Sequence, residues 1–402
     1  MEYKKRQGET EYEFRLRVCR DWELIGTWPA VTDILNRELG HDFSESTYRK
    51  EYDGFRKYFD ANKATLVDSS AYLNEIDQKE VELQKETIKF RDQRREFNKL
   101  IMRQARTEHL HDMFLESIKD INKICPLVKS SAAEDAANQD KKGNTEAVLF
   151  FSDWHYGMVT DNIFNKYNTG ICRRRVSDLV REVGLRLNTI HPDILHVVML
   201  GDCAHGAIHA SARVCSEEAA SDQLMHATEL AAEAINELSQ IVPKTLVYST
   251  YGNHMRTVQS KNDSVHSDNM EQIVPWWLKE RFMGRKDVEI VDGEYYEFIK
   301  VNAAGFNIVC THGDLDKIKD IGLTVNTIFS KKYGEAVDYT VSADKHHVEE
   351  FDRMGIESTT VPALCGSDDY ANDNRLYAMP GQTMMTFKKG YGKDASYTIR
   401  LK

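Results

Sequence analysis

Five short apolar runs in the C-terminal part of the chain end in the same kind of residue. The runs are AVLFF, ILHVVML, TLVYST, FNIVC and DYTVS, and each is followed closely by Asp, Asn or His. Helix-like segments lie between several of them, at 174–189 and 216–241, and this alternation is typical of an α/β domain. Because sites in open α/β sheets lie at the carboxyl ends of the strands, five such endings predict one shared functional site.

The residues at these endings have the chemistry of a metal site without sulfur. In chain order they are Asp153, His155, Asp202, Asn253, His254, His312, Asp344, His346 and His347. Asp, Asn and His donors without clustered Cys favour Mn²⁺, Fe or Zn²⁺ over a sulfur-bound structural zinc. The donors are too many for one tetrahedral ion, so we expect two ions, an arrangement that clamps both oxygens of a phosphoryl transfer.

The series D-x-H, G-D, G-N-H, H-G and a last His-containing motif resembles the calcineurin-like metallophosphoesterase superfamily over about 147–350. The resemblance implies a β-sandwich flanked by helices, completed by strands up to residue 402, with two metals at one edge. It also implies phosphodiester hydrolysis by a metal-bridging hydroxide. The tail LCGSDDYANDNRLYAMPGQTMMTF and the overall layout resemble metallophosphoesterases of phages and prophages, which are commonly described as recombination nucleases or DNA endonucleases.

By that resemblance each motif residue has a role. The first ion is held by Asp153, His155, Asp202 and His346, and the second by Asp202, Asn253 and His312. The shared Asp202 is essential to catalysis, and His254 donates a proton to the leaving oxygen or stabilises the phosphate charge.

The last motif departs from the family's usual G-H-x-H, because Ala343 and Asp344 stand where Gly and His are usual. Asp344 is able to hold the second ion as a harder oxygen donor, which favours Mn²⁺ or Mg²⁺. Mn²⁺ is therefore the expected metal, with Mg²⁺, Fe and Zn²⁺ as alternatives. The other interpretation of Asp344 is a weakened second site.

Residues 1–62 predict a helix-turn-helix-like domain. The segment TWPAVTDILNREL has Thr27 as a possible N-cap and one apolar face, Gly40 closes it, and a second helix follows. Such a pair with polar and basic residues at the start of the second helix is the helix-turn-helix pattern. Thr47, Arg49 and Lys50 are then the expected DNA contacts. The alternative is an ordinary helical hairpin.

The middle of the chain predicts an extended helix. Residues 70–125 contain no Gly or Pro and are dense in Glu, Lys, Arg and Gln, so we expect a long helical or coiled-coil arm over 63–128. Such an arm would allow a homo-oligomer, although the imperfect heptad fits an arm packed on the main domain equally well. A flexible linker, 129–146, precedes the metallophosphoesterase domain, 147–402.

Composition bears on the location of the protein and on its substrate. The seven Cys are scattered without C-x-x-C spacing, and there is neither an apolar signal region nor a membrane-spanning run, so we expect a cytoplasmic protein without a membrane partner. The net charge of −11 neither indicates nor excludes nucleic acid. We expect a DNA nuclease, whose substrate phosphates contact Arg213, Arg256 and Lys345. The alternatives are a small-molecule phosphodiesterase or phosphatase, for instance on cyclic nucleotides, and a DNA-binding regulator with a degenerate metal site.

Overall fold

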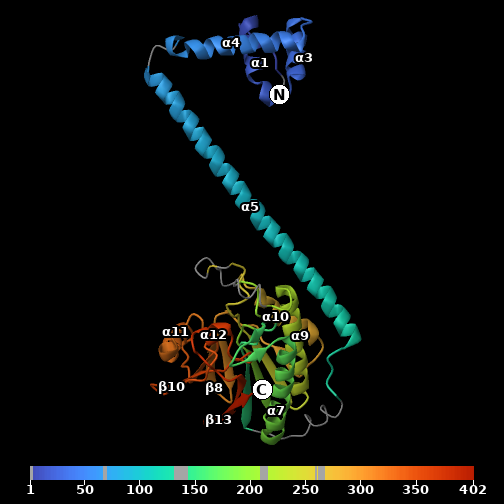
Figure 1. Cartoon of the computed structure of the whole chain (residues 1–402), viewed down its shortest axis with the longest axis vertical. Coiled ribbons are helices and arrows are strands. Elements are labelled where there is room, and N and C mark those ends of the chain that lie inside the picture. Colours follow the sequence, from blue (N-terminus) through green and yellow to red (C-terminus); the bar gives the residue numbers. More distant parts are fainter. Residues whose placement is uncertain (1–2, 67–69, 131–143, 209–215, 259, 261–267) are drawn as a thin grey trace. The chain divides into compact units, whose positions relative to one another are not determined.

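The computed structural model describes residues 3–66, 70–130, 144–208, 216–258, 260 and 268–402 (Figure 1). The chain divides into two compact units, Met1–Arg106 and Thr107–Lys402. The predicted linker, 129–146, lies mostly outside the described residues. Among the described helices, none combines the length and the apolar character that crossing a lipid bilayer requires.

The first unit is entirely helical, as predicted. Its helices are α1 (Glu11–Arg20), α2 (Trp22–Ile25), α3 (Trp28–Leu39), α4 (Glu45–Leu66) and the first part of α5 (Ser70–Ile124). Thr10 and Glu13 form a capping box that begins α1. The predicted bounds of α3 are confirmed, because the Thr27 side chain accepts from the N–H of Ala30 and Gly40 ends the helix in a left-handed conformation.

The small core of this unit joins α1, α3 and the start of α4. Its buried side chains are Phe14, Val18, Cys19, Val31, Leu35 and Tyr48. Along α5, the described side chains of residues 79–99 are exposed, including the apolar Leu83, Phe90 and Phe97. Self-association through this arm stays a prediction.

The second unit is a sandwich of two sheets. One sheet has the order β13-β12-β1-β4-β5-β6, in which β1, β4, β5 and β6 run parallel. The other has the order β10-β11-β9-β8-β7, in which β8, β9 and β11 run parallel. The strands of the first sheet are β1 (Thr145–Phe151), β4 (Ile194–Met199), β5 (Lys244–Ser249), β6 (Val288–Ile290), β12 (Gly381–Lys388) and β13 (Gly392–Arg400). Those of the second sheet are β7 (Ile299–Ala303), β8 (Phe306–Thr311), β9 (Tyr339–Ser342), β10 (Glu350–Arg353) and β11 (Ile356–Thr360).

Helices cover the outer faces of the sandwich (Figure 1). They are α7 (Thr169–Ile190), α9 (Ala220–Ser239), α10 (Ile273–Arg281) and α11 (Ile321–Tyr333), and a short helix, α12 (Asp369–Asp373), lies between β11 and β12 in the chain. A small hairpin, β2 (Thr160–Asp161) and β3 (Lys166–Tyr167), precedes α7. The alternation of β1 shows the layering, because Val148 and Phe150 pack between the sheets while Ala147 and Leu149 pack in the core shared with α7 and α9. The predicted α/β sandwich flanked by helices is confirmed.

The end of α5 belongs to this second unit. Phe114 and Ile118 are buried against Trp277 of α10, and Asn122 donates to the carbonyl of Glu280 at 3.1 Å. Arg281 binds Glu229 of α9 and the carbonyl of Cys125, so it ties the end of α5 to the helical layer.

The core of the first unit makes a stability prediction. Leu35→Ala should destabilise this unit by about 2–5 kcal/mol, because Leu35 is fully buried and its truncation leaves a cavity. Leu24→Ala is the matched control, because the Leu24 side chain is 78% exposed. Calorimetric melting of the full chain measures both variants, and an equal effect of the two substitutions would contradict this account of the core.

Candidate metal centre

The ends of five strands bring the predicted ligands together. Asp153 and His155 follow β1, Asp202 follows β4, Asn253 and His254 follow β5, and His312 follows β8. Asp344 and His346 follow β9. Backbone bonds extend beyond the strands, because the N–H of His155 donates to the carbonyl of Asp202 at 2.9 Å and the N–H of Ala343 to that of His312 at 2.8 Å. The chain thus continues its parallel pairing into the site.

Asp202 lies between two groups of ligand atoms. On one side, His155 Nε2 is 3.9 Å from both Asp153 Oδ1 and Asp202 Oδ2, and His346 Nε2 is 3.5 Å from Asp153 Oδ1. On the other side, His312 Nε2 is 3.3 Å from Asp202 Oδ2. The two groups therefore share one carboxylate.

Asp344 completes the second group. Its Oδ1 is 3.7 Å from His312 Nε2 and accepts from Asn253 Nδ2 at 3.0 Å. Its backbone N–H donates to Asp153 Oδ2 at 3.3 Å. The unusual Asp of the last motif thus lies inside the cluster.

The backbone of the cluster is strained. Five non-glycine residues adopt the left-handed region, with φ of 50° at Asp153, 43° at His155, 54° at Asp202, and 62° at both Asp344 and His346. Residues with a Cβ rarely adopt this region, and such strain gathers at functional sites. All five are predicted ligands.

Several of the predicted ligand atoms are buried and have no hydrogen-bond partner. Within the described part of the chain, Asp153 Oδ1, both ring nitrogens of His155 and His312 Nε2 are buried without a hydrogen-bond partner. Burying polar atoms in this way is costly unless something else satisfies them. Carboxylate oxygens and neutral imidazole nitrogens both coordinate divalent cations. The unpartnered atoms of Asp153, His155 and His312 therefore fit the binding of metal ions.

Electrostatics favours the protonation state that a metal needs at Asp202 and His155, whereas the charge of Asp202 outweighs burial and raises the pKa of His312 well above its ordinary value. Burial would raise the pKa of the Asp202 carboxyl, but the charges of His254 and His312 outweigh burial and hold that pKa well below its ordinary value. Burial, together with the charge of His254, lowers the pKa of His155 well below its ordinary value. Asp202 is thus ionised and His155 neutral.

A buried thiol stands near the first group. The sulfur of Cys365 lies within 4.8 Å of ligand atoms of His155 and His346. Burial and the charge of Asp153 raise the pKa of the Cys365 thiol well above its ordinary value, so the thiol stays protonated.

His254 is held in one orientation. Its backbone N–H donates to Asp202 Oδ1 and its ring Nδ1 to the carbonyl of His205, both at 2.9 Å. Its ring centroid lies 4.5 Å from that of His155. The bond from Nδ1 leaves Nε2 as the nitrogen that gains or loses a proton.

Two glycines and one glutamate support the ligand loops. A Cβ on Gly201 would lie 2.6 Å from the carbonyl carbon of Tyr251, and one on Gly252 would lie 2.5 Å from Asp202 Cγ. The buried Glu271 accepts from the backbone N–H groups of Cys203 at 2.8 Å and Gly252 at 2.5 Å. The glycines of G-D and G-N-H thus let the two loops touch. Glu271 follows no strand, so the strand-end pattern did not single it out.

The predicted phosphate-binding cations differ in their placement. Lys345 Nζ donates to Asp344 Oδ2 at 2.6 Å. The Arg256 guanidinium donates to the carbonyls of Asn253 and Val258 at 2.8 and 3.2 Å, so it holds its own loop. Arg213 lies outside the described residues.

The predicted DNA contacts lie in the first unit. Thr47, Arg49 and Lys50 are exposed at the start of α4, on either side of the buried Tyr48. Arg49 Nη1 is 2.8 Å from Glu45 Oε1, one helical turn away.

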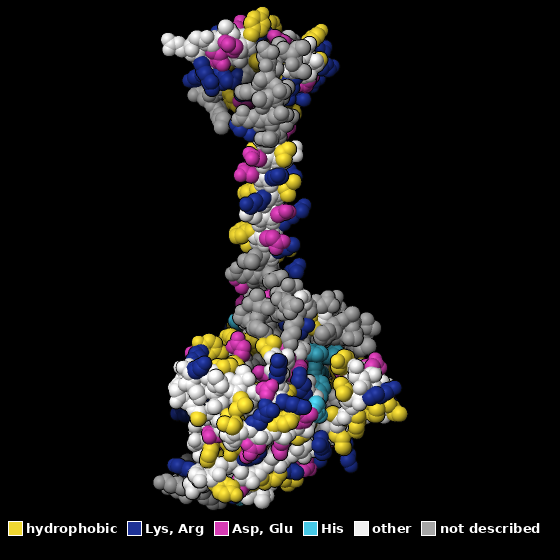
Figure 2. All heavy atoms as spheres, turned by 90° about the vertical axis from the view of Figure 1, so that its left-hand side faces the viewer, with side chains coloured by type: hydrophobic (Ala, Val, Ile, Leu, Met, Phe, Trp, Pro, Cys, Tyr) yellow, Lys and Arg dark blue, Asp and Glu magenta, His cyan; other side chains and the backbone are white. Residues whose placement is uncertain are grey.

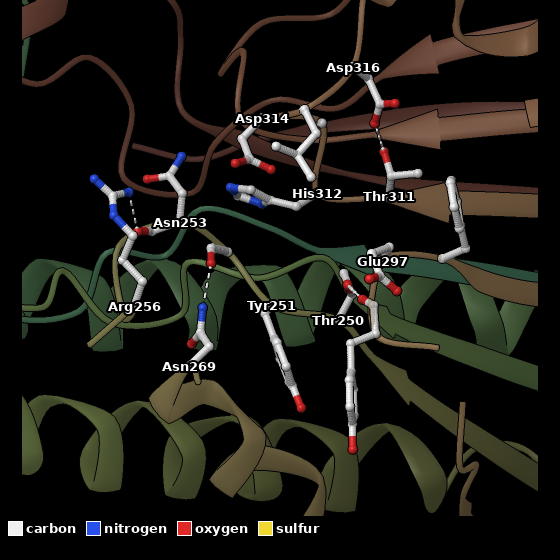
Figure 3. Close-up of a pocket in the computed structure, with 15 residues that line it drawn as sticks. Thr250, Tyr251, Asn253, Arg256, Asn269, Glu297, Thr311, His312, Asp314 and Asp316 are labelled. Carbon is white, nitrogen blue, oxygen red and sulfur yellow. Dashed lines mark hydrogen bonds between the residues drawn. The ribbon is translucent and has the colours of Figure 1, made fainter. Parts of the chain in front are cut away.

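The metal centre opens to solvent. Histidine side chains are visible in a hollow on one face of the second unit (Figure 2). A cavity adjoins the second ligand group and is lined by Asn253, His312, Arg256 and Asp314 among others (Figure 3).

Comparisons with known proteins give one full-length relative. Residues 1–67 match the family model described as the YonJ N-terminal domain. The chain is 24% identical to the SPbeta prophage-derived uncharacterized protein YonJ of Bacillus subtilis (strain 168), over 98% of this chain and 97% of the relative. The chain is therefore similar over its whole length to a prophage-derived protein, and this similarity assigns no activity.

Solved structures resemble parts of the chain more distantly. A novel archaeal phosphodiesterase is 12% identical, with 63% of this chain and 99% of that chain covered and a TM-score of 0.32. Vps29 of Entamoeba histolytica in complex with Zn²⁺ is 12% identical, with 63% and 98% covered and a TM-score of 0.28. A predicted phosphoesterase of Streptococcus pneumoniae TIGR4 is 9% identical, with 63% and 98% covered and a TM-score of 0.27. Scores this low carry no argument for function.

The shared carboxylate makes a metal-binding prediction. Saturating Mn²⁺ should raise the melting temperature of the wild-type chain, because a ligand present at 100 times its Kd stabilises by about 2.7 kcal/mol. Asp202→Asn should lose most of this response and weaken Mn²⁺ binding by more than about 100-fold, the upper end for changes outside the ligand shell. Calorimetric titration measures the affinity. Asp161→Asn, at an exposed carboxylate, is the control, and an unchanged affinity in Asp202→Asn would refute the shared site.

Proposed function

We propose that this chain is a two-metal-dependent phosphodiesterase that hydrolyses DNA. The observation that carries the proposal is a set of Asp, His and Asn donors, partly buried, in two groups that share the buried Asp202. Two divalent ions that share a carboxylate are the arrangement suited to phosphodiester hydrolysis. The resemblance of the strand-end motifs to calcineurin-like metallophosphoesterases supports the same reaction.

The two groups have distinct members. Asp153, His155, Asp202 and His346 would hold the first ion. Asp202, Asn253, His312 and Asp344 would hold the second. Bound ions supply an activated water and neutralise phosphate charge. The mixture of carboxylate, amide and imidazole donors suits Mn²⁺, the ion we propose.

The second group explains how Asp344 replaces the family's usual His. Asn253 Nδ2 donates to Asp344, so the amide oxygen of Asn253 is the atom left to ligate. Lys345 donates to the second oxygen of Asp344 and holds the carboxylate in place. Asp344 would therefore serve as the ligand that the usual His provides in the second group. For this reason we propose that the enzyme is active.

His254 supplies the proton for the leaving oxygen. The carbonyl of His205 fixes the proton on Nδ1, so Nε2 is the nitrogen that transfers a proton. The backbone bond to Asp202 holds the residue beside the shared ligand. We therefore propose that His254 acts on the substrate through Nε2.

This role predicts a dependence on the leaving group. His254→Ala should keep Mn²⁺ binding and slow the hydrolysis of DNA by about 10²–10⁴-fold, the usual range for a lost general acid. The loss should be much smaller on bis-p-nitrophenyl phosphate, whose leaving group needs no proton. Steady-state kinetics measures both substrates, and His109→Ala, at an exposed histidine of α5, is the control. An equal loss on the two substrates would exclude proton donation by His254.

DNA is the proposed substrate because the first unit offers a surface for it. α3 and α4 pack around buried Leu35 and Tyr48, and Thr47, Arg49 and Lys50 lie exposed at the start of α4. The start of the second helix is where helix-turn-helix proteins contact DNA.

This surface makes a salt-dependence prediction. Arg49→Ala combined with Lys50→Ala should weaken the binding of duplex DNA and lower the slope of log K against log [salt] by about 0.9 for each phosphate that is no longer neutralised. Lys85→Ala combined with Lys89→Ala removes the same charge from an exposed part of α5 and is the control. Fluorescence anisotropy at several salt concentrations measures both slopes. If both pairs lower the slope equally, the start of α4 is not a specific DNA-binding surface.

A further inference from the structure

A cavity beside the metal centre has features of a binding site for a flat ring. Two of its lining residues, Asn253 and His312, belong to the proposed second ligand group (Figure 3). The rest of its wall comes from the end of β5, the loop after β8 and the segment 296–298. A phosphodiester has two ester substituents, so a phosphate at the ions needs a place for each of them.

Two tyrosines give the cavity an aromatic wall. The rings of Tyr251 and Tyr296 are stacked, with centroids 4.6 Å apart and planes 19° from parallel. The contact with Tyr251 holds the ring of Tyr296 in place, and the Tyr296 side chain is still 50% exposed. A tyrosine held in a stack with part of its surface open is able to stack on a nucleobase, and stacking of this kind contributes about 1–3 kcal/mol per base.

The charge of the cavity argues against a second phosphate. Glu297, Asp314 and Asp316 line it, and Asp316 accepts from the Thr311 hydroxyl at 2.7 Å. Arg256 is the basic residue of the described lining, and its guanidinium is bonded to backbone carbonyls. Carboxylates repel phosphate, but they accept hydrogen bonds from the amino groups of bases.

We propose that this cavity binds the nucleobase adjacent to the scissile phosphate, an inference that rests on the proposed phosphodiesterase function. A base cannot stay stacked and paired inside a duplex while it stacks on Tyr296. The substrate is therefore a strand whose base is unpaired at the point of cleavage, or one whose base leaves the stack at an energetic cost. Single-stranded DNA has no base pairs to break and so a smaller cost, and we expect it to be cleaved faster than the duplex of the same sequence.

The neighbouring tyrosine offers a matched control. Tyr295 lies in the same segment and is 45% exposed, but it lines a different cavity. Lys332 Nζ lies 3.3 Å from the centroid of its ring. Loss of Tyr295 therefore removes a similar ring from the same loop without changing the cavity beside the metals.

Two chromogenic esters separate base binding from chemistry. The p-nitrophenyl ester of thymidine 5′-monophosphate carries one base, and bis-p-nitrophenyl phosphate carries none. Tyr296→Ala should lower kcat/KM for the thymidine ester by about 5–150-fold, which corresponds to the stacking of one base. It should leave bis-p-nitrophenyl phosphate unchanged, while Tyr295→Ala should leave both esters unchanged. Tyr296→Trp, which keeps an aromatic face, should retain activity on the thymidine ester.

The outcomes are distinct. No effect of Tyr296→Ala on the thymidine ester would overturn base binding, and so would an equal loss on both esters, which indicates damage to the metal centre. Faster cleavage of duplex than of single-stranded oligonucleotide by the wild type would also overturn it. Failure of the wild-type chain with Mn²⁺ to hydrolyse either ester or DNA would instead overturn the proposed function itself.

Discussion

Two carboxylates buried close together among histidines are the constraint around which the second unit is organised. Asp153 is fully buried and Asp202 is 2% exposed, and their ligand atoms lie together with those of His312 within 4.8 Å. Uncompensated burial of such charge costs several kcal/mol per ion. Backbone N–H groups of His254 and Asp344 offset part of this cost, since each donates to one of the carboxylates. Divalent cations would offset the remainder, so metal binding and the stability of this region are coupled.

The sandwich makes such a costly arrangement possible because it leaves the loops little freedom. β1, β4 and β5 lie side by side in register, so their ends are fixed relative to one another before any ligand is added. Gly201 and Gly252 let the loops after β4 and β5 touch, and Glu271 bonds to both loops. The left-handed backbone of the ligands is then held by its surroundings, as expected where strain persists at a functional site.

How far the sequence alone predicts this molecule depends on how local each signal is. Apolar runs and the residues that follow them are local, so β1, β4, β5, β8 and β9 and the candidate ligands at their ends were predicted together. Glu271 and Gln382 were not, because their roles arise from partners far away in the chain: Glu271 bonds to Cys203, and Gln382 accepts from the N–H of Ser152 at 2.8 Å. Arg256 was predicted to contact a substrate phosphate because it is a basic residue near a motif. The sequence gives no sign that its guanidinium is bonded to backbone carbonyls.

The metal centre, the cavity and the first unit would each contribute differently to the choice of substrate. Metal ions recognise any phosphodiester, because charge and geometry at phosphorus are the same in every one. Selectivity must then come from groups that contact the rest of the substrate, and such groups lie in the wall that holds Tyr251 and Tyr296. Contacts from Arg49 and Lys50 to phosphates would add affinity but no preference for sequence. In the proposed nuclease, whether a base is free to leave the duplex would then decide the cleavage site, so the structure of the DNA would determine where it is cut.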